Sequence, residues 1–389
     1  MKSNFDFLNR YWPALAQIGA TAETYVYSDP NACIYKLGMF AERLVQEILV
    51  FEHIAEPAVD NTHANRIRIL KRAGLLPHEI DNTLYVLRKT RNSAVHIGTD
   101  SVDEAKTLLS LTYNLAVWFM ETYGDWGYIA PEFVMPSEIT HEDLESVIAE
   151  QERKIEELTK QLAVVKTAAS GKTQKERARQ SESVSAMMNW NEAQTRCLID
   201  EQLRLSGWEA DTQNLRYSKG TRPVKGRNIA ISEWPTNSAF YKNGYADYAF
   251  FVGEKLVALM DAKKMSEDVA STIDVQVKDY AAHIKPEDIP HTVGNWNGYQ
   301  VPFLFASNGR AYLEQLRTKS GIWFLDVREQ ENQPYPIRNW FSPSDLMEKL
   351  GQNTAAANQA LAAADNSFMT DPNGLNLRDY QIKAVDKAT

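Results

Sequence analysis

Residues 245–263, YADYAFFVGEKLVALMDAK, decide the fold of the second half of this chain. Two apolar runs, Tyr245–Val252 and Leu256–Ala262, are separated by a short turn that contains glycine. Such runs joined by such a turn predict an antiparallel hairpin. In a hairpin the start of the first strand lies beside the end of the second strand. The stretch therefore predicts a sheet with one rim that gathers residues from both of its ends.

Three charged residues stand at that rim. Asp247 lies near the start of the first strand, and Asp261 and Lys263 lie at the end of the second. Side chains alternate along a strand, so Asp261 and Lys263 share one face. Two aspartates can hold Mg²⁺, which activates a water and neutralises charge on a phosphate, while a lysine orients that water. The trio predicts phosphodiester hydrolysis, although solvated strand-end acids paired with a lysine give the same short pattern.

A helix expected over residues 265–284 extends the candidate site. Gln276 and Tyr280 are spaced by four in it, so both point from one face. There they can reach the active lysine or a nucleic-acid backbone. The polar edge of an amphipathic helix is the alternative interpretation.

Two polar loops are candidates for contact with DNA phosphates. Residues 212–232 contain no acid and form a loop with glycines and a proline. Such a loop can lie against phosphates or be an ordinary solvated surface. The segment Ser307-Asn308-Gly309-Arg310 offers a second loop of this kind, or a plain turn. The candidate DNA-binding residues are Arg216, Lys219, Arg222, Lys225, Arg227, Asn308 and Arg310.

Composition divides the rest of the chain. Apolar residues three and four apart predict a helical bundle over residues 1–138. A heptad seam predicts a charged helical spacer over residues 139–187, either a free coiled coil or a helix packed on its own protein. The seam is lost from Ser170 to Ser185, which predicts a mobile end. Residues 351–370 form a small-residue linker to a last piece, residues 371–389.

Residues 188–350 alternate strands with helices. This order predicts an α/β domain with a central mixed sheet. The fold class is therefore multidomain, α plus α/β. Besides the hairpin, the expected elements are a helix over 191–206, capped by Asn191, and strands over 301–306 and 321–327.

The overall composition bounds the class of protein. The chain has 389 residues, a net charge of -9 and 44% hydrophobic residues, which predicts two to three folded domains and excludes wholesale disorder. Its two cysteines exclude a disulfide framework and a cysteine-rich zinc site. The chain has no run of 18 consecutive apolar residues, so no membrane span is predicted. Its polar N-terminus does not resemble a signal peptide. We expect a cytoplasmic protein without a membrane partner.

Several motifs together resemble the nuclease domain of the restriction (R) subunits of type I restriction-modification enzymes. They cover most of residues 190–350: Glu192–Asp200 with Gly207-Trp208, Ser218-Lys219-Gly220, Glu233-Trp234-Pro235, Tyr245–Tyr248, Ser307–Arg310 and Lys319–Trp323. The resemblance implies a restriction-endonuclease-like, RecB-like fold of the PD-(D/E)xK superfamily. These enzymes cleave double-stranded DNA and work with methyltransferase and specificity subunits.

The resemblance also implies residue roles. Asp247, Asp261 and Lys263 match the catalytic positions, with the two aspartates holding Mg²⁺. Gln276 and Tyr280 match a QxxxY motif that belongs to the same catalytic set. Glu192 matches an acidic helix position that can assist metal binding. Asp261 stands where these subunits usually carry glutamate, so the metal or the strand must shift by about one methylene.

The two ends of the chain carry one motif each. Leu377-Arg378-Asp379-Tyr380-Gln381 resembles the start of a superfamily 2 helicase-like motor, in which Gln381 would read the adenine of ATP. A phosphate-binding loop is lacking, so we expect the chain to be the N-terminal piece of a longer enzyme. We expect ATP to bind to the full-length enzyme and not to this piece alone. Near the other end, Arg91 and His96 resemble the R-x4-H motif of HEPN-like helical domains. The N-terminal domain is then expected to be a docking module or, alternatively, a ribonuclease.

Two rival functions remain open. One is a non-catalytic DNA-binding or assembly module, in which Asp261 marks lost chemistry. The other is the nuclease part of a different nuclease-helicase.

Overall fold

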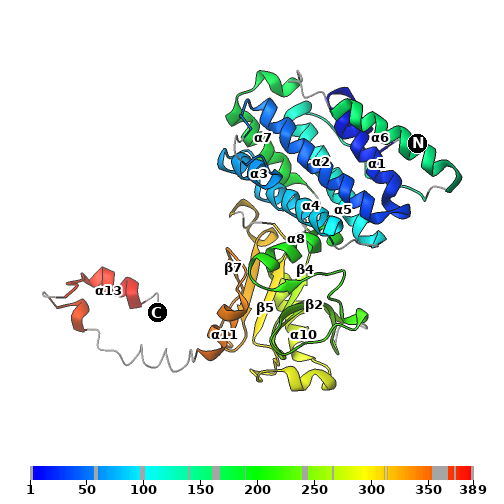
Figure 1. Cartoon of the computed structure of the whole chain (residues 1–389). Helices are drawn as coiled ribbons and strands as arrows, with labels where there is room; N and C mark the ends of the chain where they lie inside the picture. The colour runs from blue at the N-terminus through cyan, green and yellow to red at the C-terminus, as the bar shows by residue number, and fades with distance from the viewer. Residues whose placement is uncertain are drawn as a thin grey trace. The chain divides into compact units, whose positions relative to one another are not determined.

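The computed structural model describes residues 3–56, 60–96, 101–138, 141–159, 167–188, 190–238, 244–264, 267–310, 312, 314–352, 367–371 and 374–386. The chain forms two compact units, Met1–Pro343 and Ser344–Thr389. The first unit contains an N-terminal helical region followed by an α/β domain (Figure 1).

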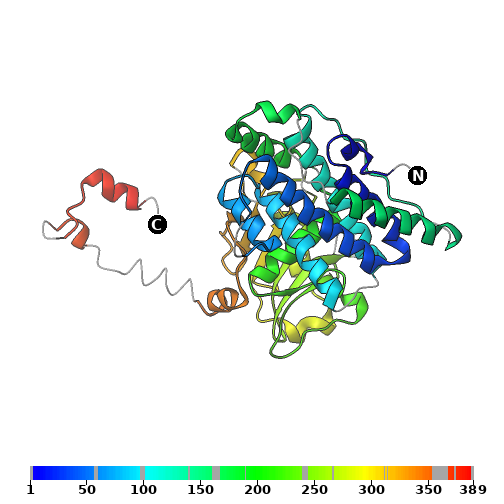
Figure 2. The same ribbon diagram turned by 45° about the horizontal axis from the view of Figure 1, so that its top comes forward.

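Long helices that share one apolar core make up the helical region, and Figure 2 shows them lying side by side. Proline at the first position starts the first two helices, where its missing N–H costs no hydrogen bond. The Asp29 side chain caps the second by accepting the Ala32 N–H. The bounds are η1 (Asp6–Arg10), α1 (Pro13–Ser28), α2 (Pro30–Phe51), α3 (His63–Arg72), α4 (His78–His96), α5 (Val102–Phe119) and the π-helical η2 (Met120–Gly124).

The helix that carries the first part of the heptad seam, α6 (His141–Thr159), packs against α1. Lys36 Nζ lies 2.6 Å from a Glu152 carboxylate oxygen, and the Thr24 hydroxyl lies 3.2 Å from Gln151 Oε1. Of the two alternatives left open by the sequence, the described part of this helix is therefore packed on its own protein.

The predicted mobile end of the spacer is wrong. Residues there form η3 (Ala168–Gly171) and α7 (Gln174–Met187). Arg177 on α7 makes a two-pronged, buried ion pair with Glu52 on α2, at 2.7 and 2.5 Å. Ser181 and Ser185 are buried as well. A heptad pattern registers only apolar residues, so it cannot detect a helix that is held by polar contacts.

The α/β domain opens with α8 (Glu192–Leu205), capped by Asn191 as predicted. Its seven-stranded mixed sheet runs in sequence order, with β1–β2 and β4–β5 parallel and the other neighbours antiparallel. The predicted α/β domain with a mixed sheet is thereby confirmed. The strands are β1 (Glu209–Ala210), β2 (Asn228–Pro235), β3 (Tyr245–Val252), β4 (Lys255–Ala262), β5 (Phe303–Ser307), β6 (Ile322–Asp326) and β7 (Tyr335–Ile337).

The hairpin and the strands predicted over 301–306 and 321–327 match β3–β4, β5 and β6 within two residues. The predicted loop over 212–232 is too long at its C-terminal end, because β2 starts at Asn228. Basic and small residues lead into this strand and hide its apolar run. The helix expected over 265–284 is shorter and holds a π turn: α9 (Ala270–Thr272), η5 (Ile273–Val277) and α10 (Lys278–Ala282). Further short helices are η4 (Tyr217–Lys219), η6 (Pro286–His291) and η7 (Glu314–Lys319).

The second unit is described only in part. Most of α11 (Pro343–Gly351) belongs to it, with η8 (Ser367–Met369) and α13 (Asp379–Asp386). Much of the predicted linker, residues 353–366, lies outside the described residues. Among the residues that the structure describes, no helix has the length and hydropathy to cross a membrane.

Candidate active site

The β3–β4 hairpin sets the two aspartates opposite each other. Tyr248 on β3 pairs with Met260 on β4 in antiparallel register. One position further along each strand, Asp247 therefore lies opposite Asp261. The Ala262 N–H donates to Asp247 Oδ2 at 2.6 Å, which fixes that carboxylate against the end of β4. Both aspartates are buried. The hairpin geometry inferred from the sequence is therefore confirmed.

Lys263 follows β4 directly and is held from two sides. Its Nζ lies 2.5 Å from an Asp261 carboxylate oxygen and donates to Gln276 Oε1 at 2.8 Å. The Gln276 amide in turn donates to the Tyr280 hydroxyl at 2.7 Å. Gln276 lies in the π turn η5 and Tyr280 in α10, which packs on the sheet. A chain of side chains from this helical segment thus positions the lysine.

A cavity of about 210 Å³ opens over these groups. Its lining is almost wholly polar and brings together residues from α8, β3, β4, the loop after β4, and η5. The lining residues are Glu192, Tyr245, Asp247, Asp261, Ala262, Lys263, Lys264, Glu267 and Gln276. The predicted trio and Gln276 therefore share one cavity, at the sheet rim where the sequence puts them.

Burial shapes the charge state of the aspartates. Burial, and then the neighbouring Asp261 carboxylate, raise the pKa of Asp247 well above its usual value. Burial also raises the pKa of Asp261, although the Lys263 ammonium opposes the shift. Burial would lower the pKa of Lys263, but its pairing with Asp261 outweighs this and the net shift is upward. Two adjacent buried carboxylates repel each other when both are ionised, so this rim favours a bound cation.

The oxygen donors fit Mg²⁺. Asp261 Oδ2 is buried and, despite its ion pair with Lys263, receives no hydrogen bond of good geometry from the described residues. Mg²⁺ in proteins is commonly held by one or two carboxylates and keeps several waters. No group of three or more histidine, cysteine, aspartate or glutamate residues close enough to hold a metal occurs in the described ranges. Asp247 and Asp261 are accordingly the two candidate direct ligands, and Glu192 only borders the cavity.

Arg196 is a member of the site that the sequence analysis missed. It lies one turn after Glu192 on α8, and its guanidinium pairs with Asp247 and, at 2.7 Å, with Glu192. The i, i+4 spacing of Glu192 and Arg196 is the signal that could have found it.

Glu233 on β2 is a second missed residue. Ser232 pairs with Tyr248 and Trp234 with Ala246, so Glu233 lies opposite Asp247. Its φ is +53°, a conformation that costs a non-glycine residue free energy and often marks functional sites. Glu233 forms an ion pair with Arg216 at 3.1 Å and accepts a hydrogen bond from Arg196 at 3.4 Å. The sequence analysis included Glu233 in the Glu233-Trp234-Pro235 motif but gave its side chain no role at the site.

The five basic residues of the predicted DNA-binding loop do not lie together. Arg216 pairs with Glu233 and so borders the site. Lys219 and Lys225 are exposed, and Arg222 stacks over the Tyr217 ring at 3.7 Å. Arg227 pairs with Glu209 at 2.5 Å.

Distance along the sheet separates Arg227 from the acids. Its carbonyl accepts the N–H of Gly253, at the hairpin turn. At about 3.3 Å per residue, that turn lies roughly 16–20 Å along β3 from Asp247. Arg216 is therefore the loop residue best placed for a role at the site.

Asn308 and Arg310 are buried rather than offered to a ligand. The Asn308 amide donates to the Lys319 carbonyl at 2.8 Å, and the Arg310 guanidinium donates to the Met188 carbonyl at 3.3 Å. These contacts tie the turn after β5 to the loop before β6 and to the segment between α7 and α8. In this structure both side chains make contacts within the protein, and their predicted contact with DNA stays a prediction.

The remaining candidates lie outside the site. Gln381 is on α13 in the second unit, where its side-chain oxygen accepts the Arg378 N–H at 3.0 Å. Its predicted contact with adenine stays a prediction. Arg91 on α4 pairs with Glu42 at 2.6 Å. The side chain of its motif partner, His96, lies outside the described residues.

Comparisons with known proteins agree with the sequence motifs. A family described as "Type I restriction enzyme EcoKI endonuclease subunit second domain" matches residues 209–350. The endonuclease subunit of the type I restriction enzyme EcoKI from Escherichia coli (strain K12) is 29% identical over an alignment that covers 100% of this chain. The chain spans 39% of the length of that relative. No solved structure matches this chain significantly.

Proposed function

Because this chain is, over its whole length, a homologue of the endonuclease subunit of the type I restriction enzyme EcoKI, we propose that it is a nuclease. The proposed reaction is Mg²⁺-dependent endonucleolytic cleavage of double-stranded DNA by residues 188–350. The observation that carries the proposal is the cavity at the rim of β3 and β4, where Asp247, Asp261 and Lys263 meet.

The residues of this cavity suit phosphodiester hydrolysis. Asp247 and Asp261 would hold Mg²⁺, which supplies an activated water and neutralises charge on the scissile phosphate. Lys263 stands beside Asp261 with its ammonium held by Gln276, so it can orient the attacking water or stabilise the transition state. Tyr280 restrains Gln276 and thereby the lysine. Burial of the acids keeps these charges in a medium of low dielectric, where electrostatic stabilisation is strong.

Partners and ATP follow from the homology alone. In the complete enzyme, methyltransferase and specificity subunits would select the DNA target, and a motor beyond residue 371 would use ATP with Gln381 at the adenine. The chain spans 39% of the length of the relative, and these activities are proposed for the complete enzyme only.

The test is Asp261→Asn in the complete enzyme, assembled with its other subunits. This variant keeps the side-chain shape but removes a charged oxygen ligand, so it should abolish cleavage of circular plasmid while ATP hydrolysis continues. The matched control is Asp274→Asn, at an exposed acid of the same domain that pairs only with Lys278 among the contacts described. The control should cut at the wild-type rate.

Cleavage at the wild-type rate by Asp261→Asn would place the nuclease centre elsewhere. Absence of cleavage in the wild-type complex with Mg²⁺ would instead favour the rival function, a DNA-binding or assembly module. Failure to co-purify with a methyltransferase subunit would favour a different nuclease-helicase.

A further inference from the structure

The Arg196 guanidinium lies beside Asp247, at the place where a metal ion bound by this carboxylate would lie. Its side chain is 13% exposed and that of Asp247 is 11% exposed, so the pair is largely shielded from water. The same guanidinium contacts Glu192 and Glu233. A buried positive charge therefore already balances the acids at this edge of the sheet.

The two oxygens of Asp247 are not equivalent. Oδ2 accepts the Ala262 N–H, and Oδ1 accepts from Arg196 Nη2. Oδ1 is thus the oxygen that the backbone leaves for a metal, and it is the one that Arg196 holds. A guanidinium and a divalent cation repel each other strongly at such a distance in a buried site. The two cannot share Oδ1 without a large loss of affinity for the metal.

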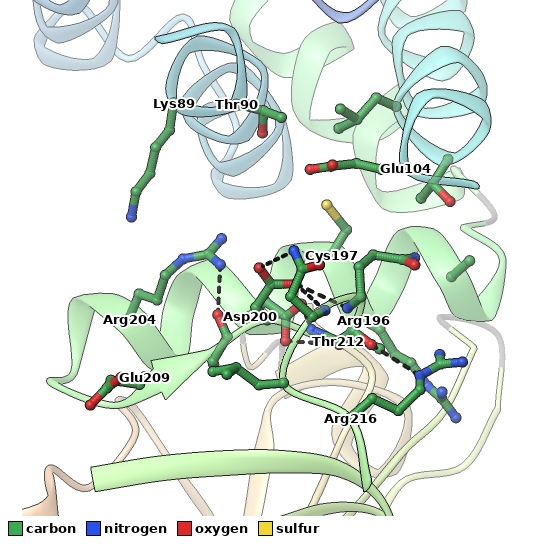
Figure 3. Close-up of a pocket in the computed structure, with 18 of the residues that line it drawn as sticks. Lys89, Thr90, Glu104, Arg196, Cys197, Asp200, Arg204, Glu209, Thr212 and Arg216 are labelled. Atoms are coloured by element: carbon green, nitrogen blue, oxygen red, sulfur yellow. Dashed lines mark hydrogen bonds between the residues drawn. The ribbon is translucent and has the colours of Figure 1, made fainter. Parts of the chain in front are cut away.

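A second cavity beside α8 gives the guanidinium space to move. A cavity of about 880 Å³ lies between α8, the helices α4 and α5, and the segment around β1 (Figure 3). Arg196 lines it, and Glu192 lines both this cavity and the smaller one over the acids. Glu104 and Asp211 also line it and add negative charge to its walls. Arg196 Nε has no hydrogen-bond partner among the described residues, so only the ends of the group anchor it.

We propose that Arg196 is an internal counter-ion of the metal site. Without metal its guanidinium neutralises Asp247, and a divalent cation binds only by displacing it from Oδ1 toward the larger cavity. Arg196 therefore weakens metal binding. It acts as a positioning residue, because Asp247 can bind the metal only after the Arg196 side chain has moved away. The inference rests on the proposed metal site at Asp247 and Asp261.

Calorimetric titration of this chain with Mn²⁺ tests the proposal without any cleavage assay. Arg196→Met removes the competing charge and keeps an unbranched apolar stem, so it should bind Mn²⁺ about tenfold more tightly than wild type. Arg204→Met is the matched control: it removes the same charge from the same helix and the same cavity, but Arg204 pairs with Glu201 rather than with the acids of the site. The control should bind Mn²⁺ as wild type does, and Asp261→Asn should lose binding.

The outcomes separate the two proposals. Equal or weaker binding by Arg196→Met, with binding lost in Asp261→Asn, overturns the role of Arg196 and leaves the metal site standing. Absence of Mn²⁺ binding by all the proteins removes the metal site and the inference together.

A second measurement uses the wild-type chain and does not depend on the folding of a variant. An arginine-selective dicarbonyl reagent, with peptide mapping by mass spectrometry, reports whether the Arg196 guanidinium is free. Its modification should be several-fold faster with Mn²⁺ than with a chelator, because displacement frees it from Asp247. Modification of Arg204 should not change. An Arg196 rate that is the same with and without metal contradicts the proposal.

Discussion

Asp200, on the buried side of α8, carries the clearest pH dependence of a single residue. Its carboxylate accepts the Thr212 N–H at 2.7 Å and the Thr212 hydroxyl at 2.9 Å (Figure 3). It also accepts the Tyr248 hydroxyl at 2.9 Å. Burial nevertheless raises its pKa from 3.8 to about 6, against the effect of these hydrogen bonds. The native state therefore holds a proton on Asp200 at pH values where the unfolded chain has lost it.

This predicts that folding stability falls as the pH rises from about 4 to about 6. The shift of about two pKa units corresponds to roughly 3 kcal/mol across that window, because protonated Asp200 favours the native state below it. Asp200→Asn should have a flatter stability curve there. Urea unfolding at a series of pH values measures the slope. The raised pKa values of Asp247 and Asp261 make stability fall with pH as well, so the informative quantity is the difference between the wild-type and Asp200→Asn curves of unfolding free energy against pH. Parallel curves would contradict the prediction.

At the scale of elements, α7 is attached to the helical region by a buried ion pair in addition to the apolar contacts of Val184 and Ala178. The Arg177–Glu52 pair is the main link, with side chains 9% and 1% exposed. Ser185 adds a hydrogen bond to Glu79 at 3.1 Å and Ser181 one to the Leu75 carbonyl at 3.3 Å. Removing one partner of such a pair leaves the other charge buried and uncompensated.

We predict that Glu52→Gln destabilises the chain by about 3 kcal/mol or more. Thermal unfolding measures the loss, and hydrogen exchange should show faster opening of α7 in particular. The matched control is Glu150→Gln, which breaks the exposed pair with Lys154 on α6 and should change stability little. Equal effects of the two substitutions would mean that the buried pair does not hold α7.

At the scale of the whole molecule, the helical region and the α/β domain share a core. Trp190 and Leu198, at the start of the α/β domain, are fully buried in the apolar cluster of the helical region. Gln194 donates to the Ser110 hydroxyl at 3.1 Å, and Lys89 pairs with Glu201 at 3.3 Å. A cut at residue 187 would expose apolar surface and break these contacts.

Residues 188–343 expressed alone should consequently melt about 10 °C lower than the intact chain, from the lost burial of two large side chains. Differential scanning calorimetry measures the shift. Trp190→Ala in the intact chain should lower the melting temperature in the same direction, which separates lost packing from an artefact of truncation. An unchanged melting temperature for residues 188–343 would show that the α/β domain is self-sufficient.

The sequence by itself determined the hairpin and the meeting of Asp247, Asp261 and Lys263. Strand alternation and antiparallel pairing are local rules, and they act over less than 20 residues here. The capped helix of α8 followed from the same kind of local pattern, through Asn191. The family resemblance rested on these motifs, and the comparisons agree with it.

Tertiary structure alone decided what surrounds the trio. Arg196 on α8 pairs with Asp247, and Glu233 on β2 lies opposite it, at 51 and 14 residues away in sequence, and the pattern of the hairpin itself does not report these neighbours. Arg310 likewise contacts the distant segment between α7 and α8, through the Met188 carbonyl. Local rules determine which residues share a strand face. Burial and charge balance depend on segments that are distant in sequence, and burial and charge balance determine which polar residues face a ligand and which stabilise the fold.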